Sequence, residues 1–265
     1  MKPFPALLVA ALVFAPVTVT ANELYDPSIV HQPEEGVVKL YGAGGPHTAF
    51  QKVAEVWQAR TGTPVVITAG PESRWSLNAQ SDADIIWGTS KQSMTAFLET
   101  YKTFFSDLVQ PIYIRPAVIA VKKGNPKKIQ GFDDLLKPGM RVVVTEGAGI
   151  YNTSGTGIWE DLAGRLGRLS DVSAFRANII EYGLGSGASF RAFKEQDADA
   201  WITWPNWPIN NPEELELIEL GPERRLWRDI NIAVAPNASA EAQQFAEFLL
   251  SDEAQKIMKT EGWVR

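Results

Sequence analysis

The chain has 265 residues, no cysteine, two histidines and a formal net charge of −6 at pH 7. The lack of cysteine excludes a disulfide framework, a thiol nucleophile and thiolate metal ligands. The acidic balance argues against nucleic acid as a partner, because nucleic-acid binding requires a basic patch. The length is sufficient for two lobes of roughly 100–150 residues each.

Residues 1–21 have the pattern of a secretory signal peptide. Lys2 gives a positive start, residues 6–14 are almost wholly apolar, and Val19-Thr20-Ala21 provides the small residues that a signal peptidase recognises. No cysteine follows for lipid attachment, and no later stretch approaches the roughly 20 apolar residues that span a bilayer. We therefore expect a freely soluble periplasmic protein of about 244 residues after cleavage.

From residue 37 on, short apolar strands alternate with amphipathic helices, and loops rich in Gly, Ser or Thr join them. In this first half, strands are predicted at 37–41, 65–68 and 83–87, and helices at 48–61 and 92–100. The first helix is predicted because its apolar residues recur at helical spacing, namely Phe50, Val53, Ala54 and Trp57. A longer β segment at 113–121 contains Pro116, which favours a crossover or an edge strand.

The same pattern restarts after Pro126. Strands are predicted at 140–145, 178–182 and 198–204, helices at 158–166 and 188–196, a long β segment at 226–235 and two closing helices within 240–261. Such alternation favours mostly parallel sheets flanked by helices. The chain is therefore predicted to be an α/β protein of two lobes. Lobe one comprises 37–114 plus 232–265, lobe two comprises 119–228, and two β crossovers near 115–118 and 229–231 form the hinge.

Four loops lead from a predicted strand into a predicted helix, at 42–47, 88–90, 152–157 and 185–187. Ligands of open parallel sheets lie beyond the carboxyl ends of the strands. Unpaired N–H groups at helix N-termini attract oxyanions, glycine permits close approach, and hydroxyls add donors. Ser and Thr are also ordinary N-caps, but four such loops together predict an anion site. The candidate ligand-binding residues in these loops are Gly44, Gly45, His47, Gly88, Ser90, Asn152, Thr153, Ser154, Gly155, Thr156 and Ser186.

Two arginines are the leading charged candidates for this site. Arg74, beside Ser73, and Arg115 each carry a fork that can hold a carboxylate or sulfo group in two parallel hydrogen bonds. The alternative for each arginine is a surface or interlobe ion pair. His47 lies directly on the first loop, where it either donates to the anion or acts as a local helix cap.

The sequence contains few of the residues and motifs that would indicate an enzyme. One of the two histidines, His31, lies in the irregular lead-in, so no histidine-based metal site or catalytic relay is visible. Neither a G-x-S-x-G nucleophile elbow nor a P-loop occurs. Residues 183–187 resemble half of a dinucleotide fingerprint, but Phe190 stands where a glycine is needed. We expect a binding protein without cofactor or metal.

Several long motifs resemble the accessory colonization factor AcfC proteins. They are YGAGGPHTAF at 41–50, RPA at 115–117 with VKKGNP at 121–126, NTSGTGIWED at 152–161 and DAWITW at 199–204. The family resembles periplasmic binding proteins of the molybdate and sulfate transporter type, with the two-lobed Venus-flytrap fold called type II. The resemblance implies a protein that holds a small oxyanion or organic acid in the interlobe cleft and delivers it to an ABC-type permease or a chemoreceptor. We expect the protein to be a monomer.

The chain departs from the family pattern at two of the loops. Gly185 stands where the family has an asparagine next to Ser186, so one side-chain donor is lost. Thr89 and Lys91 depart from the family's Ala-Ser-Glu pattern, so a charge near the cleft is reversed. These departures leave the identity of the ligand open.

Aromatic residues near the predicted loops allow a second function. Trp87 and Trp204 either line the cleft or pack in the core. The family name's link to colonization suggests an adhesin instead, for which the aromatic loop at 205–208, with Trp204 and Trp207, would offer a surface for glycans. The alternative function is therefore an adhesion or colonization factor that contacts host glycans.

Overall fold

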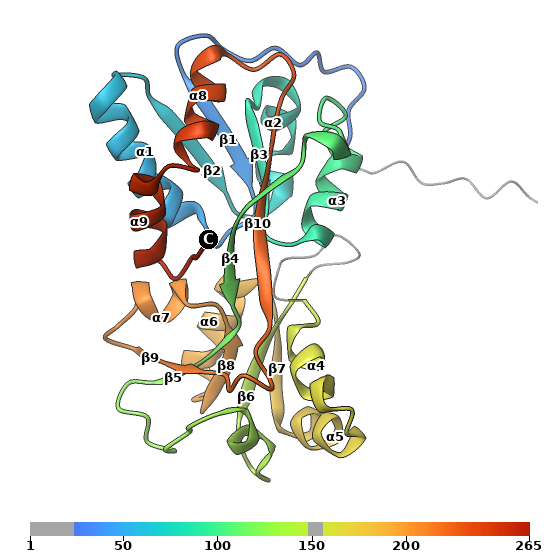
Figure 1. Ribbon diagram of the computed structural model, residues 1–265. Coiled ribbons are helices and arrows are strands. Elements are labelled where there is room, and N and C mark those ends of the chain that lie inside the picture. Colours follow the sequence, from blue (N-terminus) through green and yellow to red (C-terminus); the bar gives the residue numbers. More distant parts are fainter. Residues whose placement is uncertain (1–23, 148–155) are drawn as a thin grey trace, which may run out of the picture.

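The computed structural model describes residues 24–147 and 156–265, which form two α/β lobes stacked end to end (Figure 1). Residues 1–21, where a signal peptide is predicted, and the candidate ligand residues 152–155 lie outside the described residues. The sheet of lobe one contains, in spatial order, β2 (Val65–Ala69), β1 (Val38–Gly42), β3 (Ile85–Gly88), β10 (Trp227–Val234) and β4 (Gln110–Pro116). The sheet of lobe two contains β7 (Ile179–Leu184), β6 (Val142–Glu146), β8 (Ala200–Thr203), β5 (Val118–Lys122) and β9 (Leu215–Glu219).

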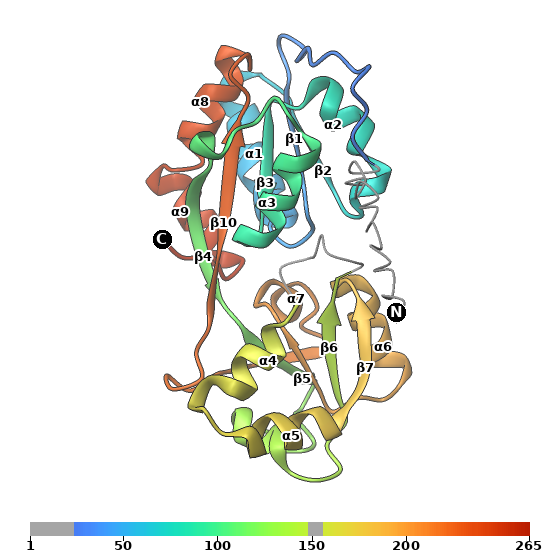
Figure 2. The ribbon, with the colours of Figure 1, turned by 90° about the vertical axis from the view of Figure 1, so that its right-hand side faces the viewer.

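Each sheet has three parallel strands and two further strands that complete it. In lobe one, β1 pairs in parallel with β2 and β3, whereas β10 runs antiparallel to β3 and β4. In lobe two, β6 pairs in parallel with β7 and β8, whereas β5 runs antiparallel to β8 and β9. The carboxyl ends of the parallel strands face the opposite lobe, as the arrowheads of β6 and β7 show in Figure 2. The loops that follow these strands therefore meet between the lobes.

Helices cover both faces of each sheet, because alternate residues of every buried strand point to opposite faces. In lobe one, Leu40 packs with α1, α8 and α9, whereas Tyr41 packs with α2 and α3. The helices of lobe one are α1 (His47–Thr61), α2 (Ser76–Asp82), α3 (Lys91–Thr100), α8 (Ala240–Phe248) and α9 (Asp252–Thr260). Those of lobe two are α4 (Ile158–Ala163), α5 (Leu169–Asn178), α6 (Ser186–Glu195) and α7 (Asn206–Asn210). None of the helices in the described ranges has the length and apolar character needed to span a bilayer.

The predicted β segment at 113–121 is two strands that belong to different sheets. β4 forms an edge of the first sheet and ends at Pro116, and β5 begins at Val118 between β8 and β9. Pro116 has no N–H to continue the ladder, and the N–H of Ala117 instead donates to the carbonyl of Leu226 (2.8 Å). The chain thus crosses between the lobes within one residue, beside the second crossing that leads into β10.

The structure contains elements that the sequence pattern does not reveal. The aromatic loop predicted at 205–208 is wrong, because residues from Asn206 on form the short helix α7. Pro205 precedes this helix and Pro208 lies in its first turn, where an N–H would have no partner in any case. Strand β9 has a charged, alternating sequence at the edge of its sheet, and α2 and α5 bury few apolar residues. Weak periodicity explains why these elements escaped prediction.

Candidate functional site

The loop between β1 and α1 is fixed by the buried indole of Trp87. The indole N–H donates to the carbonyl of Ala43 (2.7 Å), and a Cβ on Gly42 would overlap the Trp87 ring. Trp87 is fully buried, so it supports the loop from the core and does not line the cleft. α1 then begins at His47 without a side-chain cap. Its first N–H groups therefore keep the partial positive charge that favours an anion.

Capping differs between the helices that begin at the cleft. α1 and α6 have no side-chain cap, and the residue before α6 is Gly185, which has a positive φ (+84°). α3 is capped, because the hydroxyl of Ser90 accepts from the N–H of Ser93 (3.2 Å). The Ser93 hydroxyl in turn accepts from the N–H groups of Thr89 (3.0 Å) and Ser90 (3.1 Å). The Ser90 oxygen therefore serves as a helix cap, as Ser often does at a helix N-terminus, while its own O–H is not used by this bond.

Arg115 is the second-last residue of β4, next to the point where the chain crosses between the lobes. Its guanidinium carbon lies 4.2 Å from the ring centroid of Trp204 on one face and 4.2 Å from that of Trp263 on the other. Its Nη1 donates to Asn206 Oδ1 (3.2 Å). Arg115 is 1% exposed, and this burial lowers the pKa of its guanidinium by disfavouring the charged form. The two indole faces offset part of that cost through cation–π attraction.

The loop of α1 approaches Arg115 closely at Gly45. An ideal Cβ on Gly45 would lie 3.0 Å from Arg115 Nη1 and 3.4 Å from Nη2, and Gly45 has a φ of +108°. The structure thus brings together three of the predicted site residues, Gly45, Arg115 and Trp204, from both lobes and the crossing strand. Asn206 and Trp263 join them, and neither was predicted from the sequence.

Four buried polar atoms beside the same strand ends find no hydrogen-bond partner among the described residues. They are His47 Nδ1, Thr89 Oγ1, Thr156 Oγ1 and Thr203 Oγ1. His47 and Thr89 follow the adjacent strands β1 and β3, Thr203 ends β8, and Thr156 precedes α4. A buried polar group without a partner costs roughly 1–3 kcal/mol. Donors and acceptors left in this state on both sides of the interlobe space are what a polar ligand would satisfy.

The electrostatics of His47 are set by its surroundings in lobe one. Burial lowers the pKa of His47, and the charge of Glu261 opposes this to a smaller degree. Burial alone would raise the pKa of Glu261, but hydrogen bonds from Lys52, Asn210 and Thr48 together lower it. The imidazole is therefore neutral at pH 7, with Nδ1 available as a donor or an acceptor depending on its tautomer.

The remaining predicted site residues differ in their surroundings. Ser73 and Arg74 are exposed in a short 3-10 helix after β2, and the Arg74 side chain has no ion-pair partner in the described ranges. Gly88 is needed for packing, because a Cβ there would lie 2.7 Å from Asn231 Oδ1 and 2.9 Å from Met94. Gly44 has open space around it, and Ser186 is partly buried at the start of α6.

Replacing Gly45 with alanine is expected to weaken ligand binding because the new methyl group displaces the Arg115 guanidinium. We expect at least a tenfold loss of affinity, since a displaced charged hydrogen bond is worth about 1.5–3 kcal/mol. The measurement is isothermal titration calorimetry with a small oxyanion or organic acid that binds the wild-type protein. Gly62→Ala is the matched control, because Gly62 also has a positive φ (+79°) but no atom within 4 Å of the added Cβ. Equal losses in both variants would assign the effect to backbone strain.

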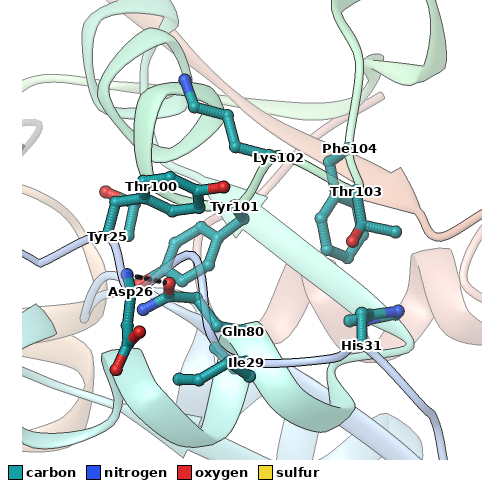
Figure 3. A pocket seen from close by; sticks show the side chains of 11 residues that line it. Tyr25, Asp26, Ile29, His31, Gln80, Thr100, Tyr101, Lys102, Thr103 and Phe104 are labelled. Atoms are coloured by element: carbon teal, nitrogen blue, oxygen red, sulfur yellow. Dashed lines mark hydrogen bonds between the residues drawn. The ribbon is translucent and has the colours of Figure 1, made fainter.

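A separate cavity of about 220 Å³ lies on lobe one, between the lead-in segment and the ends of α2 and α3 (Figure 3). Gln80 and His31, two of its polar lining residues, already have hydrogen-bond partners. Gln80 Oε1 accepts from the N–H of Asp26 (2.8 Å), and Gln80 Nε2 donates to the carbonyl of Leu24 (2.7 Å). The ring nitrogens of His31 contact Asn237 Oδ1 (3.1 Å) and the carbonyl of Ala83 (2.9 Å). The hydrogen bonds around this cavity hold the lead-in segment on lobe one. The cavity thus differs from the interlobe site, where buried polar atoms have no partners among the described residues.

Comparisons with known proteins agree with this architecture. The family model described as "Bacterial extracellular solute-binding protein" matches residues 38–264. The structure of PEB3 from Campylobacter jejuni is 40% identical, covers 86% of this chain and 99% of its own, and superposes with a TM-score of 0.81. A structure of PEB3 with L-phospholactate bound is 41% identical over the same shares, with a TM-score of 0.82. None of the curated proteins matches the chain.

More distant structures share the fold. The sulfate-binding protein SubI from Mycobacterium tuberculosis is 17% identical, with a TM-score of 0.70 and coverage of 86% of each chain. The periplasmic molybdate-binding protein of Azotobacter vinelandii is 14% identical, with a TM-score of 0.63, and covers 86% of this chain and 99% of its own. The prediction of a two-lobed, type II periplasmic binding protein fold is confirmed.

Proposed function

The chain belongs to the bacterial extracellular solute-binding protein family, and we propose that it captures a small anion between its two lobes. The ligand we propose is an organic acid or another oxyanion that carries a carboxylate, phosphate or sulfo group. The observation that carries this proposal is the guanidinium of Arg115, 1% exposed at the junction of the lobes and stacked between two indoles. Only the edges of a guanidinium donate hydrogen bonds, and their fork matches an oxyanion.

Three further features support an anion rather than a neutral ligand. The uncapped N-terminus of α1 faces the same space, and Gly45 lets its backbone approach Arg115. Polar atoms of His47, Thr89 and Thr203 are buried there without partners among the described residues. PEB3, at 41% identity, has been crystallised with L-phospholactate, which carries both a phosphate and a carboxylate. A ligand of this class would satisfy donors from both lobes at once.

Binding would be coupled to closure of the two lobes. We propose a hinge at 115–118 and, on the return crossing, at the residues just before β10, because the predicted second hinge segment 229–231 lies within that strand and pairs with β4. We assign the lobe-two donors to Asn152, Thr153, Ser154, Gly155 and Ser186. A ligand that contacts both lobes binds the closed state more tightly than the open one, and this difference in affinity drives closure. Arg74 and Ser73, exposed after β2, would complete the lobe-one side of the site.

For the biological role, we propose a periplasmic monomer, exported by residues 1–21, that hands its ligand to an ABC-type permease or a chemoreceptor. AcfC-like specificity belongs to the same proposal. The alternative role as a glycan adhesin loses its basis, because Trp204 is 4% exposed and Trp207 packs against Phe190 and Trp201 with centroid distances of 5.2 and 5.1 Å.

A thermal-shift series tests the proposed function. At a ligand concentration of 100 times the Kd, binding adds roughly 2.7 kcal/mol of stability. For a domain of this size we expect the Tm to rise by roughly 5–10 °C. L-Phospholactate is the first compound, followed by hydroxy acids, sulfonates, sulfate and molybdate, with glycerol as an uncharged control. A flat Tm across all the anions would contradict the proposal.

A further inference from the structure

The two rings that enclose Arg115 have different origins in the fold. Trp204 follows β8 and belongs to lobe two, whereas Trp263 lies in the segment after α9 and belongs to the core of lobe one. Arg115 itself is on β4, a strand of the lobe-one sheet. The Arg115–Trp263 contact therefore lies within lobe one, and the Arg115–Trp204 contact spans the two lobes.

Segment 261–264 is held firmly on both sides of the junction. Val264 forms a bridge with Ile114, the neighbour of Arg115, through two backbone hydrogen bonds of 2.8 Å. The side chain of Glu261 is fully buried, pairs with Lys52, and accepts hydrogen bonds from Thr48 (3.1 Å) and, across the lobes, from Asn210 (2.7 Å). In Figure 1 this segment lies between α9 and α7, beside β4.

Trp263 is tightly packed within this segment. It is fully buried, and its backbone N–H donates to the carbonyl of Met258 (3.1 Å), whereas its indole Nε1 has no hydrogen-bond partner among the described residues. Gly262 before it has a φ of +84° and packs so closely on Pro205 that a Cβ would overlap that ring. Burial in the close-packed core of lobe one restricts the Trp263 indole, and the guanidinium stacked on it takes its orientation from the indole.

We propose that Trp263 is a positioning residue of the anion site, which holds the Arg115 fork with its hydrogen-bonding edge toward the ligand; this inference rests on the proposed function. An arginine side chain has several rotatable bonds, so a free one loses conformational entropy when it binds a ligand. Stacking on Trp263 within lobe one removes most of that loss before the ligand arrives. Trp204 would complete the sandwich from lobe two.

The test compares three variants for affinity toward L-phospholactate and for stability. Trp263→Leu keeps an apolar side chain but removes the π face, and we expect affinity to fall roughly threefold to thirtyfold. Trp263→Phe keeps a smaller ring, and we expect it to recover most of that loss. Trp57→Leu is the matched control, because Trp57 is a buried tryptophan of the same core that contacts Phe245 and Phe248. It is expected to lower the Tm without changing affinity.

A readout that needs no ligand separates this inference from the proposed function. The Nε–H signal of Arg115 in a ¹⁵N-labelled protein, identified by its loss in Arg115→Lys, is expected to be shielded by the stacked indoles. It should lose shielding in Trp263→Leu, shift less in Trp263→Phe, and stay unchanged in Trp57→Leu. An unchanged signal in both Trp263 variants, or equal losses of affinity in Trp263→Leu and Trp57→Leu, would overturn the inference.

If the wild type binds no anion, the proposed function fails, and the Arg115 signal still decides whether Trp263 positions the guanidinium. Should Trp263→Leu fail to fold, the Phe variant decides by the same signal.

Discussion

Replacing Arg115 with lysine is expected to lower the affinity for L-phospholactate by roughly tenfold to a hundredfold. Lysine keeps the positive charge but loses the planar fork and the stacking between Trp204 and Trp263. A charged hydrogen bond contributes about 1.5–3 kcal/mol, and about 1.4 kcal/mol corresponds to a factor of ten. Isothermal titration calorimetry measures the change, and circular dichroism verifies that the variant is folded.

The control for this prediction is an exposed arginine of lobe two, away from the junction of the lobes. Arg165 is exposed in the 3-10 helix after α4, and Arg165→Ala is expected to leave affinity unchanged. Arg74→Ala addresses the second predicted fork in the same assay, with a loss of similar size if Arg74 contacts the anion. Full affinity in Arg115→Lys would mean that the arginine is structural, and would remove the main support for the anion site.

Replacing Arg224 with methionine is expected to destabilise lobe two by about 3–5 kcal/mol, because it leaves a buried carboxylate without its partner. Arg224 is 1% exposed, forms an ion pair with Asp171 and donates to the carbonyls of Leu162 (2.9 Å) and Ala163 (3.0 Å). It thereby joins the end of α4 to the start of α5. A loss of this size should lower the Tm by roughly 6–20 °C, measured by calorimetry.

The neighbouring residue provides a matched control for the Arg224 prediction. Arg225 is partly exposed and lies 3.6 Å from Glu219 on the surface, so Arg225→Met is expected to change stability by less than about 1 kcal/mol. Comparable losses in the two variants would contradict the buried-pair explanation.

Lowering the pH should reduce the difference in unfolding free energy between the Arg224→Met variant and the wild type. The hydrogen bond from Arg224 lowers the pKa of Asp171 in the folded state. The corresponding stability is fully present above the unfolded carboxyl pKa of about 4, and it is lost as pH falls through the lowered folded pKa. Denaturant unfolding at pH 7 and at successively lower pH values measures this loss.

Several parts of the fold could be predicted because neighbouring residues determine them. The spacing of Phe50, Val53 and Trp57 predicts α1, and all three are buried in the structure. The alternation of strands and helices predicts two α/β lobes, since parallel strands require helical crossovers. Elements with weak patterns were missed, as in β9, where charged residues alternate along an edge strand.

Some residues of the candidate site could be predicted from the local sequence, whereas others are recognised only from tertiary contacts. The glycine-rich turn before α1 and the arginine at 115 were predicted, and the structure brings Gly45 and Arg115 into contact. The hydroxyl of Ser90 was predicted as a ligand donor, and the structure adds that its oxygen caps α3 by accepting from the N–H of Ser93. Glycine and serine have the same local sequence signature in a cap and in a binding loop.

The sequence by itself determined the two α/β lobes, the loops that lead into helices, and a short list of charged candidates, because periodicity and turn chemistry are local properties. Only the tertiary structure decided which arginine is buried at the junction of the lobes. Arg115 lies between Trp204 and Trp263, which are 59 residues apart in the chain and belong to different lobes. Burial and stacking arise from contacts between distant segments, and no local pattern encodes them. Trp263 is part of the candidate site only because the fold stacks its indole on Arg115.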